Sequence, residues 1–337
     1  MAKVAIITGY YNRASALELT LKSLRLQTYR DIEIVVFDDA SSDDTAAQID
    51  TLLAKWKDPR FTIRRHDKNL GFVQGLINAI EATDSEFIAI QGSGDVSHST
   101  RIEKQVARLN ADMALGMVGC QFTEVQESGV GVRRIPMYPD ANGIKLSDLI
   151  RRNVYFSHGD VMYRREAYNA AGGYRAAFKY SQDYDLWLRI MKSHSVATVL
   201  ENLYERHVRF DGVSYTPSKL VAQECYSILA RRMALSSPGE EEKIYRELEN
   251  SDPVSLVDPS DPYLQTRVRQ AALRAITMNR KHDATELIGK YIKGSFYKTA
   301  FRVISATFSG EVAGSLARTL KGSPLMRKLA FSVIRNK

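Results

Sequence analysis

Four short apolar runs alternate with amphipathic helix patterns in the first 115 residues, and this alternation constrains the fold more than any other feature. The runs are VAII from Val4, IEIVVF from Ile32, FTIRR from Phe61 and FIAI from Phe87. Each is too short to be a helix, whereas the intervening segments repeat apolar residues every three or four positions. The pattern predicts an α/β fold with a mostly parallel mixed sheet covered by helices on both faces.

The fourth run leads into a candidate ligand loop, within the segment FIAIQGSGDVSHSTR that ends at Arg101. Gly92 and Gly94 allow a tight turn or a close approach of the backbone to a ligand. Ligands of open α/β sheets gather at the carboxyl ends of the strands. Hard divalent cations bind carboxylate and phosphate oxygens together. We therefore expect Asp95, at the far side of this loop, to face a diphosphate through a metal ion.

The rest of the chain divides into two further regions. Residues 116–214 carry less regular strand patterns at 117–122, 130–135, 161–163 and 196–200, with a helix at 184–191. Residues 215–337 are helical, and the segments SSPGEEE and ENSDPVSLVDPSDP are predicted to separate helices. The expected organisation is a first half at 1–115, a second half at 116–214 and a helical C-terminal region at 215–337.

Composition narrows the environment more than the function. The 337 residues include 47 Lys and Arg against 39 Asp and Glu, a net charge of +8, which suits nucleotide phosphates, anionic membranes or other polyanions equally well. Two distant cysteines, Cys120 and Cys225, form no disulfide framework and favour a reducing compartment. With no leader and no apolar run of membrane-spanning length, we expect a cytoplasmic protein with at most a peripheral membrane contact.

Two separated segments carry recognisable motifs: the opening VAIITGYYNRASALELTLKSLRLQTYRDIEIVVFDDASSDDT, and YFSHGDVMYRREAYNAAGGYRAAFKYSQDYDLWLRI. They resemble the first βαβ unit and the acceptor-side region of glycosyltransferase family 2, whose members have the nucleotide-sugar-binding GT-A fold. The resemblance covers residues 3–214. It implies that 1–115 is the nucleotide-sugar-binding half of the domain and that 116–214 is the acceptor-binding and catalytic half.

The resemblance also implies which residues hold the nucleotide. Asp39 matches the carboxylate that accepts a hydrogen bond from the uracil ring, an ionised acceptor that discriminates between bases. Its neighbour Asp38 is as well explained by a structural role. The other expected nucleotide contacts are Thr8, Tyr10, Tyr11, Lys68, Gly71, Gln74 and Ser93.

The metal-binding motif departs from the family pattern. Members carry paired acids where this chain reads Gly92-Ser93-Gly94-Asp95, so only the last acid remains. Asp95 is the expected ligand of Mn²⁺ or Mg²⁺, because the donor phosphates and waters can complete the coordination shell. His207, within LYERHVRFDGVS, matches a family histidine that reaches the metal or diphosphate, although Asp211 is an alternative match.

Asp183 matches the family's catalytic base. Displacement at an anomeric carbon needs a base to take the proton of the acceptor hydroxyl. A helix-capping role for Asp183 is the structural alternative. Gln182 stands where the family commonly has glutamate, so a charge is replaced by a neutral hydrogen-bonding group.

These residues predict an inverting glycosyltransferase that moves a sugar from a nucleoside diphosphate donor, a UDP-sugar, to a hydroxyl of a cell-surface glycan or lipid-linked acceptor. The thinned acidic motif favours an alternative, a degenerate and non-catalytic nucleotide-sugar-binding protein. A nucleotidyltransferase is a weaker alternative, because TGYYNR after the first strand lacks a glycine-rich phosphate loop.

The basic C-terminal helices allow three interpretations. A solvated surface is the simplest, and a dock on an anionic lipid surface is the second. Nucleic-acid binding is the third, and no recognised motif accompanies the charge. The residues that suggest a lipid dock are Phe296, Phe301, Ile304 and Phe308, interleaved with Lys298 and Arg302.

Overall fold

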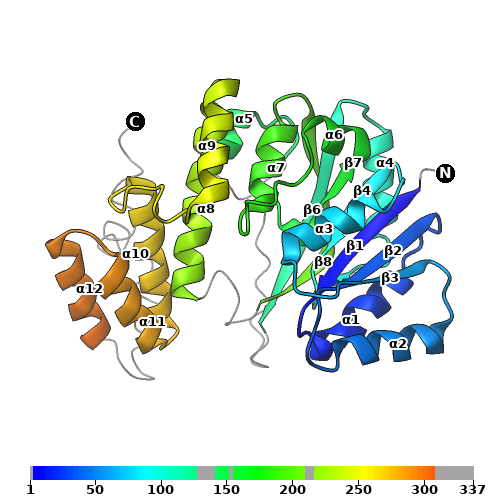
Figure 1. Ribbon diagram of the computed structural model, residues 1–337, viewed down its shortest axis with the longest axis horizontal. Coiled ribbons are helices and arrows are strands. Elements are labelled where there is room, and N and C mark those ends of the chain that lie inside the picture. Colours follow the sequence, from blue (N-terminus) through cyan, green and yellow to red (C-terminus); the bar gives the residue numbers. More distant parts are fainter. Residues whose placement is uncertain (1–2, 127–140, 152–154, 209–215, 308–337) are drawn as a thin grey trace. The chain divides into compact units, whose positions relative to one another are not determined.

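The computed structural model describes residues 3–126, 141–151, 155–208 and 216–307. The chain divides into two compact units, Met1–Arg209 and Phe210–Lys337. Figure 1 shows both units and labels most of their helices and strands. The strand predicted at 130–135 lies outside the described residues, as does Asp211.

The N-terminal unit is built on one eight-stranded sheet in the order β3-β2-β1-β4-β7-β6-β8-β5. Its first four strands are parallel, since β1 pairs with β2 and β4, and β2 pairs with β3. β7 is antiparallel to β4 and β6, whereas β8 is parallel to β6. The predicted mostly parallel mixed sheet is confirmed. Its strands are β1 (Val4–Tyr10), β2 (Ile32–Asp38), β3 (Phe61–Arg65), β4 (Phe87–Gln91), β5 (Val96–Ser97), β6 (Leu115–Gln126), β7 (Met162–Arg164) and β8 (Ser195–Val208).

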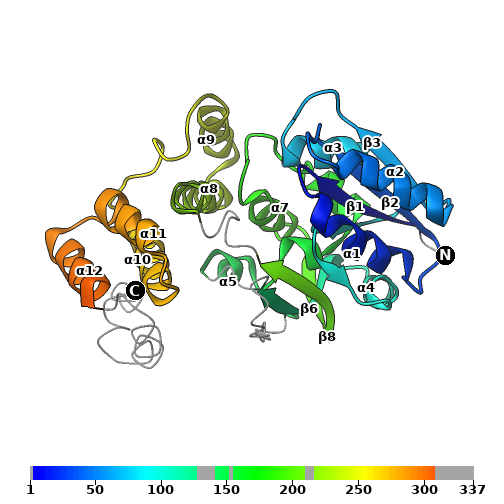
Figure 2. The same ribbon diagram turned by 90° about the horizontal axis from the view of Figure 1, so that it is seen from below.

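Helices flank this sheet (Figure 2). Side chains of alternate strand residues point to opposite faces, so Val4, Ile6, Ile34 and Val36 share one side. They form a single core with apolar residues of α1, α2 and α4. The helices of this unit are α1 (Ala14–Arg25), α2 (Thr45–Trp56), α3 (Phe72–Glu81), α4 (Arg101–Asn110), α5 (Leu146–Arg151), the 3₁₀ turn η1 (His158–Asp160), α6 (Arg165–Ala170) and α7 (Gln182–Ile190).

On the other face, the ring of Phe37 fills the space between the sheet and α3. A Cβ atom at Gly9, its partner on β1, would collide with that ring, and one at Gly75 of α3 would lie 2.5 Å from it. The ring also stacks on His66, with centroids 5.8 Å apart. Two glycines therefore let α3 approach the sheet closely, which fixes the position of the loop before α3.

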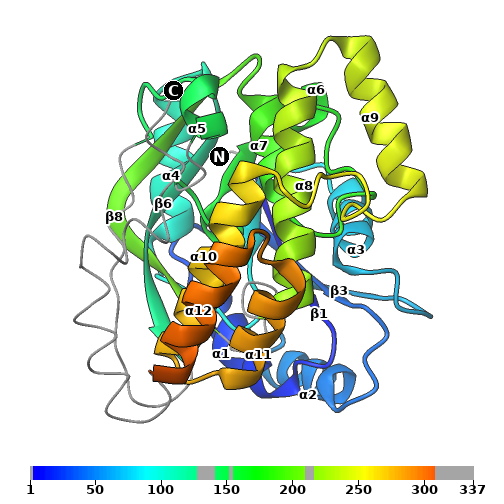
Figure 3. The same cartoon turned by 90° about the vertical axis from the view of Figure 1, so that its left-hand side faces the viewer.

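The C-terminal unit is helical. Figure 3 shows its helices from α8 to α12, coloured from yellow-green to orange in chain order. They are α8 (Pro217–Leu235), α9 (Pro238–Asn250), α10 (Pro262–Thr277), α11 (Lys281–Glu286), the π-helical η2 (Leu287–Tyr291) and α12 (Ser295–Thr307). The segment SSPGEEE separates two helices as expected, but only through Ser236 and Ser237. Pro238 already begins α9, and Glu240 and Glu241 lie in its first turn. Proline at the first helical position and acidic residues near a helix N-terminus both stabilise a helix.

We expect Gly75→Ala to destabilise the protein by about 1–3 kcal/mol, because the added methyl group overpacks the buried Phe37 ring. The matched control is Gly239→Ala in α9, where a Cβ meets nothing within 4 Å. That change should be neutral or stabilising, since alanine favours a helix. Chemical denaturation of both variants checks the difference, and equal free energies of unfolding would contradict the packing.

Candidate functional site

The parallel strands bring three polar segments to one edge of the sheet. β1, β2 and β4 end at Tyr10, Asp38 and Gln91, so the segments that follow them are neighbours. Arg13, in the segment after β1, donates from its guanidinium to the carbonyl of Ser93, 2.7 Å away. This bond ties the first segment to the loop after β4.

Asp39 receives a dense set of hydrogen bonds. The backbone N–H groups of Leu70 and Gly71 donate to its two carboxylate oxygens at 2.8 and 2.9 Å, and Nδ1 of His66 lies 2.8 Å from Oδ1. Of these three hydrogen bonds, only the one from Gly71 goes to Oδ2, so this oxygen can accept a bond from a further donor. Asp38 instead bonds the hydroxyl of Ser41. The carboxylate after β2 is therefore rigidly held at the strand edge.

The other expected nucleotide contacts differ in accessibility. Tyr11 is 50% exposed, whereas Thr8 and Tyr10 are buried, and burial raises the pKa of Tyr10. Lys68 is exposed in the segment before α3, and Gln74 donates to Asn78 within that helix. Tyr11, Asp39, Gly71 and Ser93 lie at the sheet edge, and Thr8 and Tyr10 lie beneath it.

Asp95 folds back toward β8. The hydroxyl of Tyr204 donates to its Oδ2 at 2.7 Å, and the backbone N–H of His207 donates to its Oδ1 at 2.8 Å. The same hydroxyl accepts the N–H of Gly92 at 3.0 Å. Burial raises the pKa of Asp95, and these hydrogen bonds oppose that effect. A Cβ atom at Gly92 would collide with the Asp95 carboxylate, so this arrangement requires glycine there.

The donor set around Asp95 fits a divalent cation only in part. Within the described residues, no group of three His, Cys, Asp or Glu side chains could hold a metal ion. His207 supplies a second candidate ligand, because its Nε2 is buried and makes no hydrogen bond to any of the described residues. Asp95 and His207 fit a cation that takes its remaining ligands from a bound phosphate and water.

The short turn η1 joins the two halves of the sheet at this site. Gly159 packs so closely on the Tyr204 hydroxyl that a Cβ atom there would collide with it. The buried guanidinium of Arg101 donates to the carbonyls of Gly159 and Ile90, 2.5 and 3.1 Å away. It also lies over the ring of Tyr204, 5.3 Å from the ring centre. The Asp95 loop, η1 and β8 are therefore held as one structure.

Asp183 lies in the first turn of α7 and is partly buried. One of its oxygens accepts the N–H of Tyr184 at 2.8 Å. Burial lowers the pKa of His158 in η1, and the negative charge of Asp183 opposes this effect. The amide of Gln182, beside Asp183 in α7, lies 3.5 Å from Nδ1 of His158. The preceding Ser181 has a positive φ of 55°, which turns the chain sharply into the helix. η1 therefore lies against both the Asp95 loop and the start of α7.

Three residues of this site escaped the sequence interpretation: Arg13, Arg101 and Tyr204. Tyr204 lies in the polar part of β8, beyond the apolar run at 196–200 that predicted a strand. In a regular strand, alternate residues face inward, and this alternation would have marked Tyr204 as buried. Register shifts between β6 and β8 interrupt the alternation. Arg101 carries no signal, because a helix-opening arginine is normally exposed.

Comparison with known proteins identifies the family. The family model described as glycosyl transferase family 2 matches residues 5–197. The chain belongs to glycosyl transferase family 2. EpsE of Bacillus subtilis (strain 168), named as a glycosyltransferase, is 30% identical over 66% of this chain and 82% of its own length. The O-antigen biosynthesis glycosyltransferase WbnJ of Escherichia coli is 27% identical over 68% and 87%. The protein is thus a glycosyltransferase.

Solved structures support the GT-A fold of this glycosyltransferase. S. aureus TarS 1–349 in complex with UDP superposes with a TM-score of 0.55 at 16% identity, covering 94% of this chain and 91% of that one. The mannosyltransferase PcManGT from Pyrobaculum calidifontis, in complex with GDP-Man and Mn²⁺, gives 0.55 at 19% identity, covering 91% and 87%. At these identities the likeness concerns the fold.

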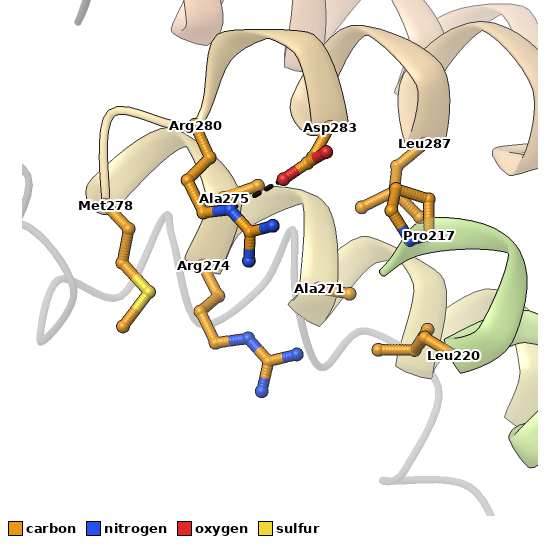
Figure 4. A pocket seen from close by; sticks show the side chains of 9 residues that line it. All are labelled: Pro217, Leu220, Ala271, Arg274, Ala275, Met278, Arg280, Asp283 and Leu287. Atoms are coloured by element: carbon orange, nitrogen blue, oxygen red, sulfur yellow. Dashed lines mark ion pairs between the residues drawn. The ribbon is translucent and has the colours of Figure 1, made fainter. Parts of the chain in front are cut away.

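A small hollow in the C-terminal unit of the glycosyltransferase lies between α8, α10 and α11 (Figure 4). Arg280 and Asp283 form an ion pair of 2.6 Å beside it. Its volume of about 260 Å³, which includes open solvent, is below the usual size of a small-molecule site. Within the described ranges, no helix combines the length and apolar composition needed to cross a membrane.

We expect a distinctive pH dependence from Asp160 in η1. Burial raises the pKa of this carboxyl well above 3.8, so the folded protein keeps a proton that the unfolded chain releases as the pH rises. The Asp160 contribution to stability must therefore fall as pH rises from about 4 toward the folded-state pKa. Asp160→Asn, which resembles the protonated carboxyl, should gain stability relative to the wild type from about pH 4.5 to about pH 7.5.

Denaturant titrations across that range measure the difference between the two proteins. Asp44→Asn, which makes the same chemical change at an exposed position, is measured alongside as the control. Parallel stability curves for the wild type and Asp160→Asn would contradict the burial effect.

Proposed function

We propose that this glycosyltransferase moves a sugar from a UDP-sugar to a hydroxyl of a cell-surface glycan or lipid-linked acceptor, with inversion at the anomeric carbon. The observation that carries the proposal is the position of η1, which lies against the Asp95 loop through Gly159 and against the start of α7 through His158, whose Nδ1 lies 3.5 Å from the amide of Gln182, the neighbour of Asp183. The expected phosphate-binding loop and the expected base are thereby set on the two sides of one turn.

The names of relatives support the substrate class. One Escherichia coli relative, WfaP, is named a UDP-Glc:alpha-D-GlcNAc-diphosphoundecaprenol beta-1,3-glucosyltransferase and is 24% identical over 65% of this chain and 82% of its own length. Others are named for amylovoran or O-antigen biosynthesis. UDP-glucose and a GlcNAc-diphosphate lipid are therefore the first donor and acceptor to test, and polysaccharide biosynthesis is the proposed setting.

In this proposal, residues 1–115 bind the nucleotide and residues 116–214 bind the acceptor. Asp39 accepts the uracil N3–H through its remaining capacity at Oδ2, while Tyr11 contacts the base from its exposed position. Gly71, Gln74, Lys68 and Ser93 border the nucleotide, and Thr8 and Tyr10 support the floor beneath it.

Asp95 and His207 would hold Mn²⁺ or Mg²⁺ together with the donor diphosphate. The bound ion supplies positive charge where negative charge develops on the leaving UDP. Of the chain's own residues, Arg13 reaches the same loop through its bond to Ser93 and adds a cation there. Asp183 takes the proton of the acceptor hydroxyl as the new glycosidic bond forms.

We expect Asp183→Asn to lower turnover by about 10²–10⁴-fold while leaving UDP affinity unchanged, because only proton removal is lost. UDP release from UDP-glucose with the GlcNAc-diphosphate lipid measures turnover, and calorimetry measures UDP binding. Asp84→Asn, at an exposed ion pair with Lys3, is the control and should retain activity. Wild-type turnover in Asp183→Asn would remove this residue from the mechanism.

The nucleotide base gives an independent prediction. Uracil presents an N3–H donor to a carboxylate, whereas cytosine presents a lone pair at the same position, which Asp39 would repel. UDP should therefore bind at least about 100-fold more tightly than CDP, because a polar group left unpaired in the complex is costly. Calorimetric titration with Mn²⁺ present tests this preference. Equal affinities for UDP and CDP would show that Asp39 does not read the base.

We also propose that the C-terminal helices contact anionic membranes from the side of α12. Phe296 and Val303 are 71% and 59% exposed on that helix, and Arg302 is exposed beside them. Phe301 is buried and faces inward, contrary to a role in membrane contact, and Phe308 lies outside the described residues. Apolar side chains flanked by cations favour association with the surface of an anionic bilayer.

Phe296→Asp should weaken sedimentation with anionic vesicles severalfold, because it removes an apolar contact and adds a repelled charge. The control is Leu235→Asp in α8, where the replaced side chain is also 71% exposed. Binding should also weaken as salt rises. Equal sedimentation with neutral and anionic vesicles would exclude the contact.

A further inference from the structure

His158 ends a chain of hydrogen bonds that runs into the core from the site. Its Nε2 lies 2.8 Å from the hydroxyl of Tyr174, which lies 3.2 Å from the hydroxyl of Tyr163. The indole N–H of Trp187 donates to the Tyr163 hydroxyl at 2.9 Å. Trp187, Tyr163 and Tyr174 are all buried, with exposures of 2%, 0% and 5%, so every proton in the chain needs a partner within it.

The indole sets the direction of this chain, because its N–H can only donate. The Tyr163 oxygen accepts that bond, so the Tyr163 hydroxyl donates to the Tyr174 oxygen. The Tyr174 hydroxyl in turn donates to Nε2 of His158. In the reverse direction, the Tyr163 hydroxyl would accept twice, and its own buried proton would lack an acceptor among the described residues, which is unfavourable. His158 is thereby required to accept at Nε2.

An imidazole that is neutral and accepts at Nε2 carries its proton on Nδ1. The amide group of Gln182 lies 3.5 Å from Nδ1, and its oxygen and nitrogen exchange places by a half-turn of the side chain. A proton on Nδ1 selects the orientation in which the amide oxygen faces His158. The amide NH₂ then points away from the imidazole.

We propose that His158 is a positioning residue of the transfer reaction: as a neutral Nδ1–H imidazole it fixes the Gln182 amide so that its NH₂ holds an oxygen of the acceptor beside Asp183. This inference rests on the proposed role of Asp183 as the base.

Every element packed against His158 is consistent with this role. α7 contributes the amide of Gln182 and the negative charge of Asp183, which opposes the lowering of the His158 pKa, and Tyr174 contributes only a hydroxyl. From α3, the ring of Phe72 meets the imidazole edge-on with centroids 5.7 Å apart. Burial lowers the pKa of His158 and keeps the ring neutral, as the hydrogen-bond chain requires.

Long-range ¹H–¹⁵N spectra of the full-length protein test the tautomer directly. The His158 signals, assigned by their loss in His158→Asn, should show a protonated Nδ1 and an unprotonated Nε2, unchanged between about pH 6.5 and about pH 8. Tyr174→Phe removes the donor to Nε2, and the Nε2 signal should shift to that of an unprotonated nitrogen that accepts no hydrogen bond. A protonated Nε2 in the wild type would overturn the inference.

Two substitutions test the positioning role with UDP-glucose and the GlcNAc-diphosphate lipid. His158→Asn places an amide N–H near the position of Nδ1, whereas His158→Gln places one near Nε2. The Asn variant should retain at least about tenfold more kcat/KM for the acceptor than the Gln variant, with KM for UDP-glucose within about twofold of the wild type in both. Equal loss in the two variants would overturn the inference.

Failure of this inference is distinguishable from failure of the proposed function. If Asp183→Asn is inactive but His158 is protonated on Nε2, only the role of His158 is wrong. If Asp183→Asn retains full turnover, the base assignment is wrong, and the role of His158 beside it is overturned with it.

Discussion

The hydroxyl of Tyr204 is the point on which the site depends. It accepts the N–H of Gly92, donates to Asp95 and lies in contact with Gly159, so it bonds the loop after β4 to the strand and the turn of the other half of the sheet. The contact is possible because neither glycine has a side chain. The paired acids common in the family cannot be accommodated here with Asp95 in this position, since a Cβ atom at Gly92 already collides with its carboxylate.

Buried polar groups surround this contact, and their energetics suit a site that is completed by a ligand. Arg101 has no exposed surface and bonds backbone carbonyls, while burial raises the pKa of both Asp95 and Asp160. A buried carboxylate without a strong countercharge is costly. A cation bound at Asp95 together with the donor diphosphate would lower that cost for Asp95. Because the loop keeps only one acid, we propose that the cation takes its other ligands from the donor's own phosphates.

The sequence predicted the parts of the fold that local patterns determine. β3 lies at the predicted residues, because an apolar run of strand length is a local property. Asp39, Asp95 and Asp183 could be selected because they follow strands or open a helix in a recognisable motif. Tyr204 and the chain from Trp187 to His158 could not, since they arise from contacts between segments that are far apart in sequence. Tyr10 was predicted at the nucleotide, but β1 continues through it and turns its side chain toward the core with Val4 and Ile6.

The central proposal is that Asp183 activates an attacking hydroxyl for direct displacement of UDP, which inverts the anomeric carbon. The most direct measurement needs no acceptor, because water can take the place of the acceptor hydroxyl. NMR spectra recorded during slow hydrolysis of UDP-α-glucose, before the released sugar equilibrates, should show β-glucose as the first product. Release of α-glucose as the first product would contradict direct displacement.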